Sequence, residues 1–379
     1  MKKDGRIVCM HILVFGRKYV AKSENIISAL KNLGMKVDFL LFPIFNTADT
    51  EGSSVISSDG KNAIVIQNTR ISMKLFSYLY HLFKSLFLFW KYFRGNRYDV
   101  FFAIDWFEGL ILIMCRTLFA RNTKVIFYSY DYYFAVGSFF NRYIIHWINN
   151  WVTKHADEVW VVNDSIRMAR EKDGAYARVN RIVPLGIEDK LLSYDICNNR
   201  HFLFVGSFKS GHNLLKMVDV FTELVKCDAR FELTIVGGGL LQKSLKQKIQ
   251  ENDAESYIHM RGFLSEKEIE SEIVSGKFAG GIALYEDTPV IATVDPGKIK
   301  DYFSWYLPVL TTSYNPISED IRMHDLGYVI EKDDVTTMVN LFKDIHLNEL
   351  RVKKHNISQY IGRHSFEEIL RKNLFEKIS

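Results

Sequence analysis

Cysteine is scarce in this chain of 379 residues, and metal-binding motifs are missing from its sequence. The four cysteines form no Cys-x-x-Cys pair, which excludes a cysteine zinc site or a disulfide scaffold and indicates a reducing compartment. The histidines are scattered without the spacing of metal ligands. No Asp-x-Asp pair, phosphate-binding P-loop or Gly-x-Ser-x-Gly motif occurs. We therefore expect no metal site, no separate cofactor, and neither P-loop nor serine hydrolase chemistry.

Long apolar runs are missing as well. No stretch approaches the roughly 18 uncharged apolar residues that a membrane-spanning helix needs, and no small-residue cleavage site follows the apolar N-terminal segment. We therefore expect a cytoplasmic protein without a signal peptide. Proline occurs at only 6 positions and the formal net charge is +5, which indicates a folded globular protein and does not require a nucleic-acid partner.

Apolar strands alternate with helices along the chain, and this order predicts an α/β fold. Continuous apolar strands are typical of parallel sheets that helices cover on both faces. Two such series, separated by a polar linker at 188–199, predict two doubly wound, Rossmann-like domains that face each other across a cleft. We place the first strand at 7–15 and a polar loop at 46–61. The predicted divisions are an N-terminal domain at 1–190, a C-terminal domain at 198–360, and a helix at 361–379 that packs back toward the N-terminal domain.

One segment, 70–97, is both basic and rich in aromatic residues. It contains six Lys and Arg residues and no acidic residue, and its apolar side chains recur at helical spacing beside a narrow polar face that includes Ser77 and His81. One interpretation is a core helix with a solvated edge. The other is an interfacial helix on an anionic membrane, which would place the protein at the inner face of the cell membrane. In that case the membrane contacts would include Lys84, Phe87, Trp90 and Lys91.

The segment that begins at Asp295 has the features of an anion site. Asp295 can cap a helix whose first residue is Pro296. The free N–H groups of Gly297 and Lys298, together with the helix dipole and the lysine charge, can then bind a phosphate. Asp301 lies one turn later, where its carboxylate can accept hydrogen bonds from two ribose hydroxyls. This spacing fits a nucleoside diphosphate, and an ordinary capped helix explains it equally well.

The same segment, continued by Leu307-Pro308-Val309, resembles the Pro-x-Lys-x-x-Glu-Tyr…Pro-Val signature of GT-B glycosyltransferases that are similar to glycosyltransferase family 4. Further resemblances to the family's strands and glycine turns follow in the right order, and together they span 130–330. They include Phe204-Val205-Gly206-Ser207-Phe208, Leu233-Thr234-Ile235-Val236-Gly237-Gly238-Gly239 and His259-Met260-Arg261-Gly262-Phe263. The resemblance implies the GT-B fold, a UDP- or GDP-linked sugar donor, and metal-independent transfer with retention of anomeric configuration.

The chain departs from the family pattern at three positions. Asp301 stands where the family has a glutamate, and Thr293 stands where it has an earlier one. Ser207 occupies the place of a phosphate-binding arginine, so that Lys209 or Lys298 would have to supply the charge. The resemblance then implies a catalytic role for Lys298 and a donor site made of Gly206, Ser207, Lys209, Gly262, Phe263, Glu286, Asp287, Gly297, Lys298 and Asp301.

The first domain offers candidates for binding the acceptor. Asp131, at the end of an apolar strand, is a candidate general base, and a loop aspartate without a catalytic role is the alternative. Asp105 and Glu108, which follow another strand, are equal rivals. Gly16 and Arg17 follow the first strand and could admit an acceptor phosphate, although Arg17 could equally be an ordinary solvated residue. The predicted acceptor-binding residues are Gly16, Arg17 and Asp105.

These observations lead to a main hypothesis and two alternatives. The main hypothesis is a glycosyltransferase that moves a sugar from a nucleotide donor to a saccharide or lipid-linked acceptor in bacterial cell-surface polysaccharide synthesis. The aromatic basic segment favours the lipid-linked acceptor. One alternative is a catalytically inactive GT-B-like subunit that binds a partner enzyme or a membrane. The other is a nucleotide-sugar epimerase with the same architecture.

Overall fold

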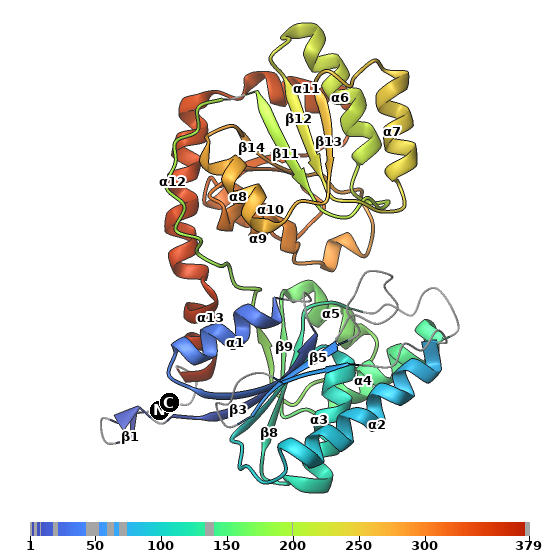
Figure 1. Cartoon of the computed structure of the whole chain (residues 1–379), viewed down its shortest axis with the longest axis vertical. Helices are drawn as coiled ribbons and strands as arrows, with labels where there is room; N and C mark the ends of the chain where they lie inside the picture. The colour runs from blue at the N-terminus through green and yellow to red at the C-terminus, as the bar shows by residue number, and fades with distance from the viewer. Residues whose placement is uncertain are drawn as a thin grey trace. The chain divides into compact units, whose positions relative to one another are not determined.

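The computed structural model describes residues 2–3, 6–7, 9–17, 22–42, 53–58, 64–67, 74–132, 140–198 and 200–375. The chain divides into two compact units, of which unit 1 comprises 1–185 with 366–379 and unit 2 comprises 186–365. Each unit contains a largely or wholly parallel sheet surrounded by helices (Figure 1). The structure therefore confirms the predicted α/β class with two parallel-sheet domains.

The sheet of unit 1 has eight strands in the order β10-β9-β8-β7-β3-β4-β5-β6. All neighbours are parallel except that β5 runs antiparallel to both β4 and β6. Most of its central strands are buried along their whole length, which explains their nearly continuous apolar sequences. The strands are β3 (His11–Arg17), β4 (Lys36–Phe42), β5 (Ser53–Ser57), β6 (Ile64–Gln67), β7 (Val100–Ile104), β8 (Lys124–Ser129), β9 (Glu158–Val161) and β10 (Asn180–Ile182).

Two expectations for this sheet were wrong. The first long strand begins at His11, and the residues before it form a separate short pair, β1 (Lys2–Lys3) with β2 (Arg6–Ile7). The predicted polar loop at 46–61 contains β5, in which Ile56 pairs with Leu40 and is fully buried. Serines flank the two β-branched residues of this strand, so its local sequence is typical of a loop. The strand conformation results from pairing with β4.

The C-terminal helix of the chain belongs to unit 1. Helix α13 (Phe366–Phe375) lies beside α1 (Ser23–Asn32), where the side-chain amide of Asn32 donates to Glu367 over 2.9 Å (Figure 1). Phe366, Ile369, Leu370 and Leu374 are buried in the same core as the sheet. The remaining helices of unit 1 are α2 (Lys74–Tyr92), α3 (Trp106–Phe119), the π-helical turn η1 (Phe140–Ile145), α4 (His146–His155) and α5 (Asp164–Lys172).

Helix α2 buries three polar side chains and exposes several large apolar ones. Ser77, His81 and Ser85 are buried, which corrects the expectation that Ser77 and His81 lie on a solvated polar face. Burial, with the nearby charges of Lys84 and Arg17, lowers the pKa of His81 to about 4, so it is neutral at physiological pH. The exposed apolar side chains define what we call the aromatic face, which consists of Phe76, Leu79, Phe83, Phe87 and Trp90.

Unit 2 contains a six-stranded sheet that is parallel throughout, in the order β13-β12-β11-β14-β15-β16. Its strands are β11 (His201–Val205), β12 (Glu232–Val236), β13 (Ile258–Gly262), β14 (Gly280–Ala283), β15 (Val309–Thr312) and β16 (Gly327–Ile330). Its helices are α6 (Leu214–Cys227), α7 (Gln242–Glu251), α8 (Glu266–Val274), the 3-10 turn η2 (Ile291–Thr293), α9 (Gly297–Ser304), α10 (Ser318–Met323), α11 (Val335–Asp344) and α12 (Leu347–His364).

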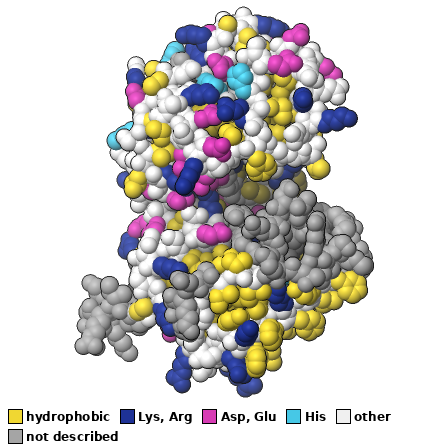
Figure 2. Space-filling view, in the orientation of Figure 1, with side chains coloured by type: hydrophobic (Ala, Val, Ile, Leu, Met, Phe, Trp, Pro, Cys, Tyr) yellow, Lys and Arg dark blue, Asp and Glu magenta, His cyan; other side chains and the backbone are white. Residues whose placement is uncertain are grey.

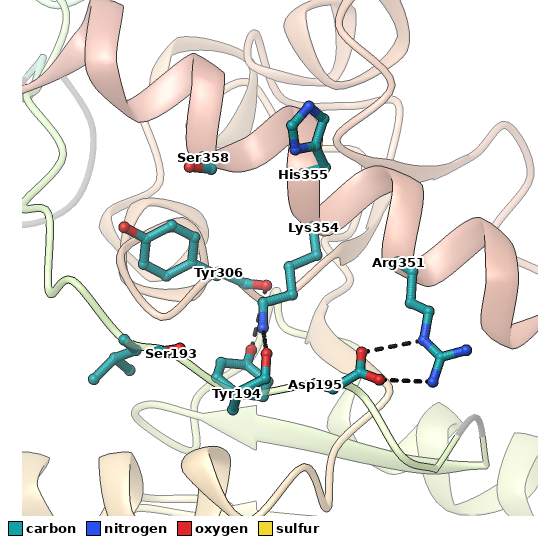
Figure 3. Close-up of a pocket in the computed structure, with 9 residues that line it drawn as sticks. Ser193, Tyr194, Asp195, Tyr306, Arg351, Lys354, His355 and Ser358 are labelled. Carbon is teal, nitrogen blue, oxygen red and sulfur yellow. Dashed lines mark hydrogen bonds and ion pairs between the residues drawn. The ribbon is translucent and has the colours of Figure 1, made fainter.

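The segment predicted to be the polar linker, 188–199, forms ion pairs with the surface of unit 2. Lys190 forms ion pairs with Glu188, Glu266 and Glu270 at 2.8–3.4 Å. Farther along, the segment borders a pocket of about 330 Å³ against α12 (Figure 3). The polar groups of this pocket bind one another, since Arg351 pairs with Asp195, and Lys354 donates to the Tyr194 carbonyl. Because these charges are already compensated, we do not place the functional site there.

Candidate functional site

Two glycine turns meet at the carboxyl ends of β11 and β12. The Gly206 N–H donates to the Val236 carbonyl over 3.0 Å, and both Gly206 and Gly237 have positive φ, at 148° and 127°. A β-carbon on Gly237 would lie 2.1 Å from the Gly206 carbonyl oxygen. Backbone atoms therefore form this end of the sheet, where ligands of open parallel sheets typically bind. Nothing but glycine permits so close an approach of the two turns.

Helix α9 begins beside these turns, and its first turn is open. No carbonyl in the described part of the chain accepts from the N–H of Gly297 or Lys298, and a β-carbon on Gly297 would meet no atom within 4 Å. The Lys298 side chain reaches back to β11, so that a β-carbon on Gly206 would lie 2.8 Å from its Cε. Free N–H groups, the positive end of the helix dipole and an ammonium group thus lie together at this point.

The Lys298 ammonium is buried without a polar partner. Its Nζ lies 3.7 Å from the centroid of the Phe204 ring and has no hydrogen-bond partner among the residues that the structure describes. Burial, reinforced by the charge of Lys209 and opposed by that of Asp301, lowers the pKa of Lys298 to about 7. Buried cations in proteins are normally paired, so an unpaired one indicates a place for an anionic ligand.

The cap of α9 differs from the expected one. Pro296, not Asp295, occupies the N-cap position, and no side chain caps the helix. The Asp295 carboxylate instead lies 3.5 Å from the ammonium of Lys300, in an ion pair whose two side chains are both buried. This pairing takes the acidic side chain away from the helix start, which leaves the N–H groups available to a ligand.

The sequence had not singled out His212, which the structure places in the same site. The His212 ring is buried, and its Nδ1 lies 3.0 Å from the Ser207 carbonyl oxygen, to which it can only donate. Burial, followed by the charges of Lys298 and Lys209, lowers the pKa of His212 to about 4, so the ring stays neutral. Its position between Lys209 and the start of α6 is the one sequence signal that could have drawn attention to it.

The other predicted donor residues lie around the same sheet edge. The Gly237 N–H donates to the Gly262 carbonyl over 2.7 Å, and a β-carbon on Gly238 would contact the Phe263 ring at 3.8 Å. Phe263 is 88% exposed, so its ring is available to a ligand. The backbone N–H of Glu286 donates to Gly211 over 3.1 Å, next to His212. Ser207, Lys209 and Asp287 are exposed, while Asp301 is half-buried one turn along α9.

A groove of about 570 Å³ adjoins this edge, between α7 and the edge strand β13. Gly237 and Gly262 line one end of it, and the side chains of Gln242, Lys246 and Met260 continue it. The groove opens beside the glycine turns, so a ligand whose diphosphate meets Lys298 has further space along α7.

Replacing Gly237 with alanine should destabilise unit 2 by about 2–5 kcal/mol, because the added methyl group clashes with Gly206 and the backbone has positive φ. Gly297→Ala is the matched control, since its methyl group enters open space. Urea unfolding of both variants would test this, and equal stability of the two would contradict the described packing.

In unit 1, the predicted acceptor residues follow three adjacent strands, β3, β7 and β8. Arg17, the last residue of β3, donates from Nε to Glu108 over 2.9 Å, and its NH2 lies 3.7 Å from the Asp105 carboxylate. Asp105 has a φ of 83° and accepts from the Trp106 N–H over 2.7 Å, which caps α3. Gly16 is packed against Ser23 and Ile104 side chains.

This cluster does not suit the acceptor phosphate that was considered for Arg17. Two carboxylates already compensate the guanidinium, so hydroxyl groups are a better match than an anion. Glu108 is completely buried, and burial, opposed mainly by Arg17, raises its pKa to about 7. Asp131, two residues beyond β8, is half-buried, and its carbonyl accepts from the Ser129 hydroxyl over 2.9 Å.

Among the described residues, no helix combines the length and hydrophobicity needed to cross a bilayer. Within the same part of the chain, no three His, Cys, Asp or Glu side chains gather closely enough to hold a metal ion.

Comparison with known proteins identifies the fold. No protein-family model matches the chain, and no curated protein is significantly similar to it in sequence. Among solved structures, a sucrose-phosphate synthase from Thermosynechococcus elongatus superposes with a TM-score of 0.71 at 14% identity, covering 97% of this chain and 99% of that one. Anabaena HepE in complex with UDP-glucose gives a TM-score of 0.66 at 12% identity, covering 97% and 99%.

A third structure, the lipopolysaccharide outer core galactosyltransferase WaaB in its apo form, has a TM-score of 0.64 at 14% identity and covers 97% of this chain and 100% of that one. These structures are GT-B glycosyltransferases, and the match extends over nearly the whole chain. The chain therefore has the GT-B fold.

Proposed function

We propose that this chain, which has the GT-B fold, transfers a sugar from a nucleoside-diphosphate donor to a hydroxyl group of a saccharide or lipid-linked acceptor. One observation carries the proposal, namely the buried and unpartnered Lys298 ammonium beside the open start of α9. The diphosphate would bind to Lys298 and to the N–H groups of Gly297 and Lys298, and Lys209 would add charge from the exposed side.

The remaining donor contacts follow from the positions of the neighbouring residues. Asp301, one helical turn from Gly297, would accept hydrogen bonds from the ribose hydroxyls. Gly262 and Phe263 would adjoin the base, and Glu286 with Asp287 would bind hydroxyls of the sugar. UDP and GDP are the nucleotides to test first. The UDP-glucose complex of HepE, which shares the fold, supports the choice of UDP.

In the reaction, the bond between the anomeric carbon and the diphosphate oxygen breaks, and the bonding electrons leave with the diphosphate. The acceptor oxygen forms the new bond, and its proton passes to the departing diphosphate oxygen. Lys298 and the first N–H groups of α9 would stabilise the departing charge without a metal ion, which is the main catalytic contribution that this geometry offers. Retention of the anomeric configuration is part of the proposal and follows from the sequence resemblance. Asp105 and Asp131 would bind the acceptor in unit 1.

We further propose that the aromatic face of α2 binds an anionic membrane at the cytoplasmic side. Phe83 is 68% exposed and Phe87 is 55% exposed, so water contacts large apolar side chains along the helix. Figure 2 shows these hydrophobic side chains gathered in one area, with Lys and Arg side chains among them. The Arg94 guanidinium lies 4.2 Å from the Trp90 ring, which combines a cation and an aromatic group as in interfacial membrane helices.

The charge of this surface favours a lipid over a protein as its occupant. The 70–97 segment has six basic and no acidic residues, which matches the negative potential of anionic headgroups. A lipid-linked acceptor in cell-surface polysaccharide synthesis would then be delivered in the membrane to which the enzyme binds. WaaB, which has the same fold, is a lipopolysaccharide outer core galactosyltransferase, and this supports the proposal.

A donor screen tests the enzymatic proposal. Thermal-shift and saturation-transfer NMR measurements with UDP- and GDP-sugars should identify a nucleotide sugar that binds wild-type protein and binds much more weakly to Lys298→Met. Binding without release of the nucleotide, with every acceptor tried, would favour the inactive subunit. Isomerisation of the donor sugar without an acceptor would indicate an epimerase.

Replacing Asp301 with asparagine should weaken UDP binding by about 10- to 100-fold, because the charged hydrogen bonds to the ribose are lost. Inorganic pyrophosphate lacks a ribose and should bind both proteins alike. Isothermal titration calorimetry with both ligands would test the assignment. An equal loss for pyrophosphate would show that Asp301 acts on the phosphate site and not on the ribose.

A further inference from the structure

Among the described residues, none compensates the charge of Lys298 at close range. Nζ is buried against the face of Phe204, and no described residue accepts a hydrogen bond from it. The nearest electrostatic influences are opposed, since Lys209 repels a charged ammonium and Asp301 attracts it. A cation–π contact returns only part of the free energy that a buried, unpaired ammonium loses by leaving water.

Two other titratable groups of this site, His212 and Tyr285, do not change their protonation state around neutral pH. Burial and the two lysines keep His212 neutral, with its pKa lowered to about 4. Burial raises the pKa of Tyr285, and the charges of Asp301 and Asp295 raise it further, so this hydroxyl also stays neutral. Of these three groups, the Lys298 amine is therefore the one that gains or loses a proton near neutral pH, because burial lowers its pKa into that range.

We propose that Lys298 is largely a neutral amine in the ligand-free protein above neutral pH, and that it then takes up a proton from solvent when the diphosphate of the donor binds. The amine lone pair accepts this proton, and the bound diphosphate then provides the anionic partner that the empty site lacks. The inference rests on the proposed function, because it assumes that the anion is the diphosphate of a nucleotide sugar.

Proton uptake would make donor binding depend on pH in a defined direction. Below the pKa of the free lysine the ammonium already exists, and binding takes up no proton. Above that pKa, Lys298 must take up a proton from solvent each time the donor binds, so the affinity for the donor decreases as pH rises. With a free pKa of about 7 and a bound lysine that stays charged, Kd should increase about 50-fold between pH 7 and pH 9.

The titration of the empty protein is the first test, and it requires no ligand. Nitrogen-15 NMR of the lysine Nζ groups, with the Lys298 resonance assigned through Lys298→Arg, should show a midpoint near neutral pH. Lys209, which is exposed to solvent, serves as the internal comparison. A Lys298 ammonium that persists to pH 9 would overturn the proposal, whatever the protein binds.

Calorimetry with UDP-glucose and GDP-mannose is the second test. Each phosphate of a nucleotide sugar carries one ester bond and the shared anhydride oxygen, so neither phosphate ionises near neutral pH. Proton exchange measured in buffers of different ionisation enthalpy therefore belongs to the protein. At pH 8 we expect uptake of nearly one proton, and Lys298→Arg, which is always charged, should bind with none.

Tight binding without uptake would refute this inference and leave the proposed function intact. Failure of both probes and of the wider donor screen would refute the proposed function, and the NMR titration would still decide the state of Lys298.

Discussion

Replacing Lys298 with methionine should lower kcat/KM for the nucleotide sugar by about 10²–10³-fold, the usual cost of losing one group that stabilises a leaving anion. The effect should appear in both KM and kcat, because Lys298 contacts the diphosphate of the bound donor and the charge on the diphosphate oxygen increases further as the bond breaks. Methionine has nearly the same length and keeps the contact with the Phe204 ring. Steady-state kinetics with the donor found in the screen would measure the loss.

The same substitution should leave the protein folded. The Lys298 ammonium has no hydrogen-bond partner in the described part of the empty protein, so no bond is lost. Its pKa is lowered in the folded state, which means that the unfolded chain binds the proton more tightly between about pH 7 and the ordinary lysine pKa. The wild-type protein should therefore gain stability as pH rises through that window, and Lys298→Met should lack this gain.

Lys209→Met, at an exposed position, should have a smaller kinetic effect, and equal effects would argue against a special role for Lys298.

Replacing Phe83, Phe87 and Trp90 together with serine should reduce binding to anionic vesicles by at least about 100-fold, since each large apolar side chain contributes on the order of 1.5–3 kcal/mol when it leaves water. All three side chains are largely exposed, so the substitutions should not disturb the core. Co-sedimentation with phosphatidylglycerol vesicles would measure the change. Turnover of a soluble acceptor analogue should be retained.

Two controls distinguish an interfacial helix from general hydrophobic adhesion. Met168→Ser removes an equally exposed apolar residue from α5 of the same unit and should leave vesicle binding unchanged. Lys84→Gln with Lys91→Gln should weaken binding at low salt and have less effect at high salt, because headgroup attraction is screened. If the triple serine variant still sediments with the vesicles, or binds equally to neutral ones, the aromatic face does not bind the membrane as proposed.

The architecture was accessible from sequence because it depends on local patterns. Buried parallel strands need nearly continuous apolar residues, and β7, β8 and β11 have them, so their positions could be read directly. Strand β5 could not be found in this way. Its serine-rich sequence has a weak strand preference, and the antiparallel pairing with β4 supplies the stabilisation.

Part of the candidate donor site could also be predicted from a local sequence pattern. A proline, a glycine and a lysine at the start of a helix are a local pattern, and the structure shows an open helix start there. The predicted capping role of Asp295 was wrong because its carboxylate forms a buried ion pair with Lys300. Burial in the folded protein favours this pairing, and the position of Asp295 before the helix does not reveal it. His212 was missed because its neutral state depends on burial and on the charge of Lys298, which only folding brings near.

The sequence by itself determined the order of strands and helices, the glycine turns and the basic, aromatic character of α2. Only the tertiary structure decided which side of α2 packs inward. Ser77, His81 and Ser85 are buried together with Phe89, whereas Phe76, Phe83, Phe87 and Trp90 are exposed. A helical pattern specifies which side chains share a face, whereas the burial of that face depends on the neighbours with which it packs. Those neighbours, among them Trp106 and Phe107 of α3, come from another part of the chain, and folding alone brings them together.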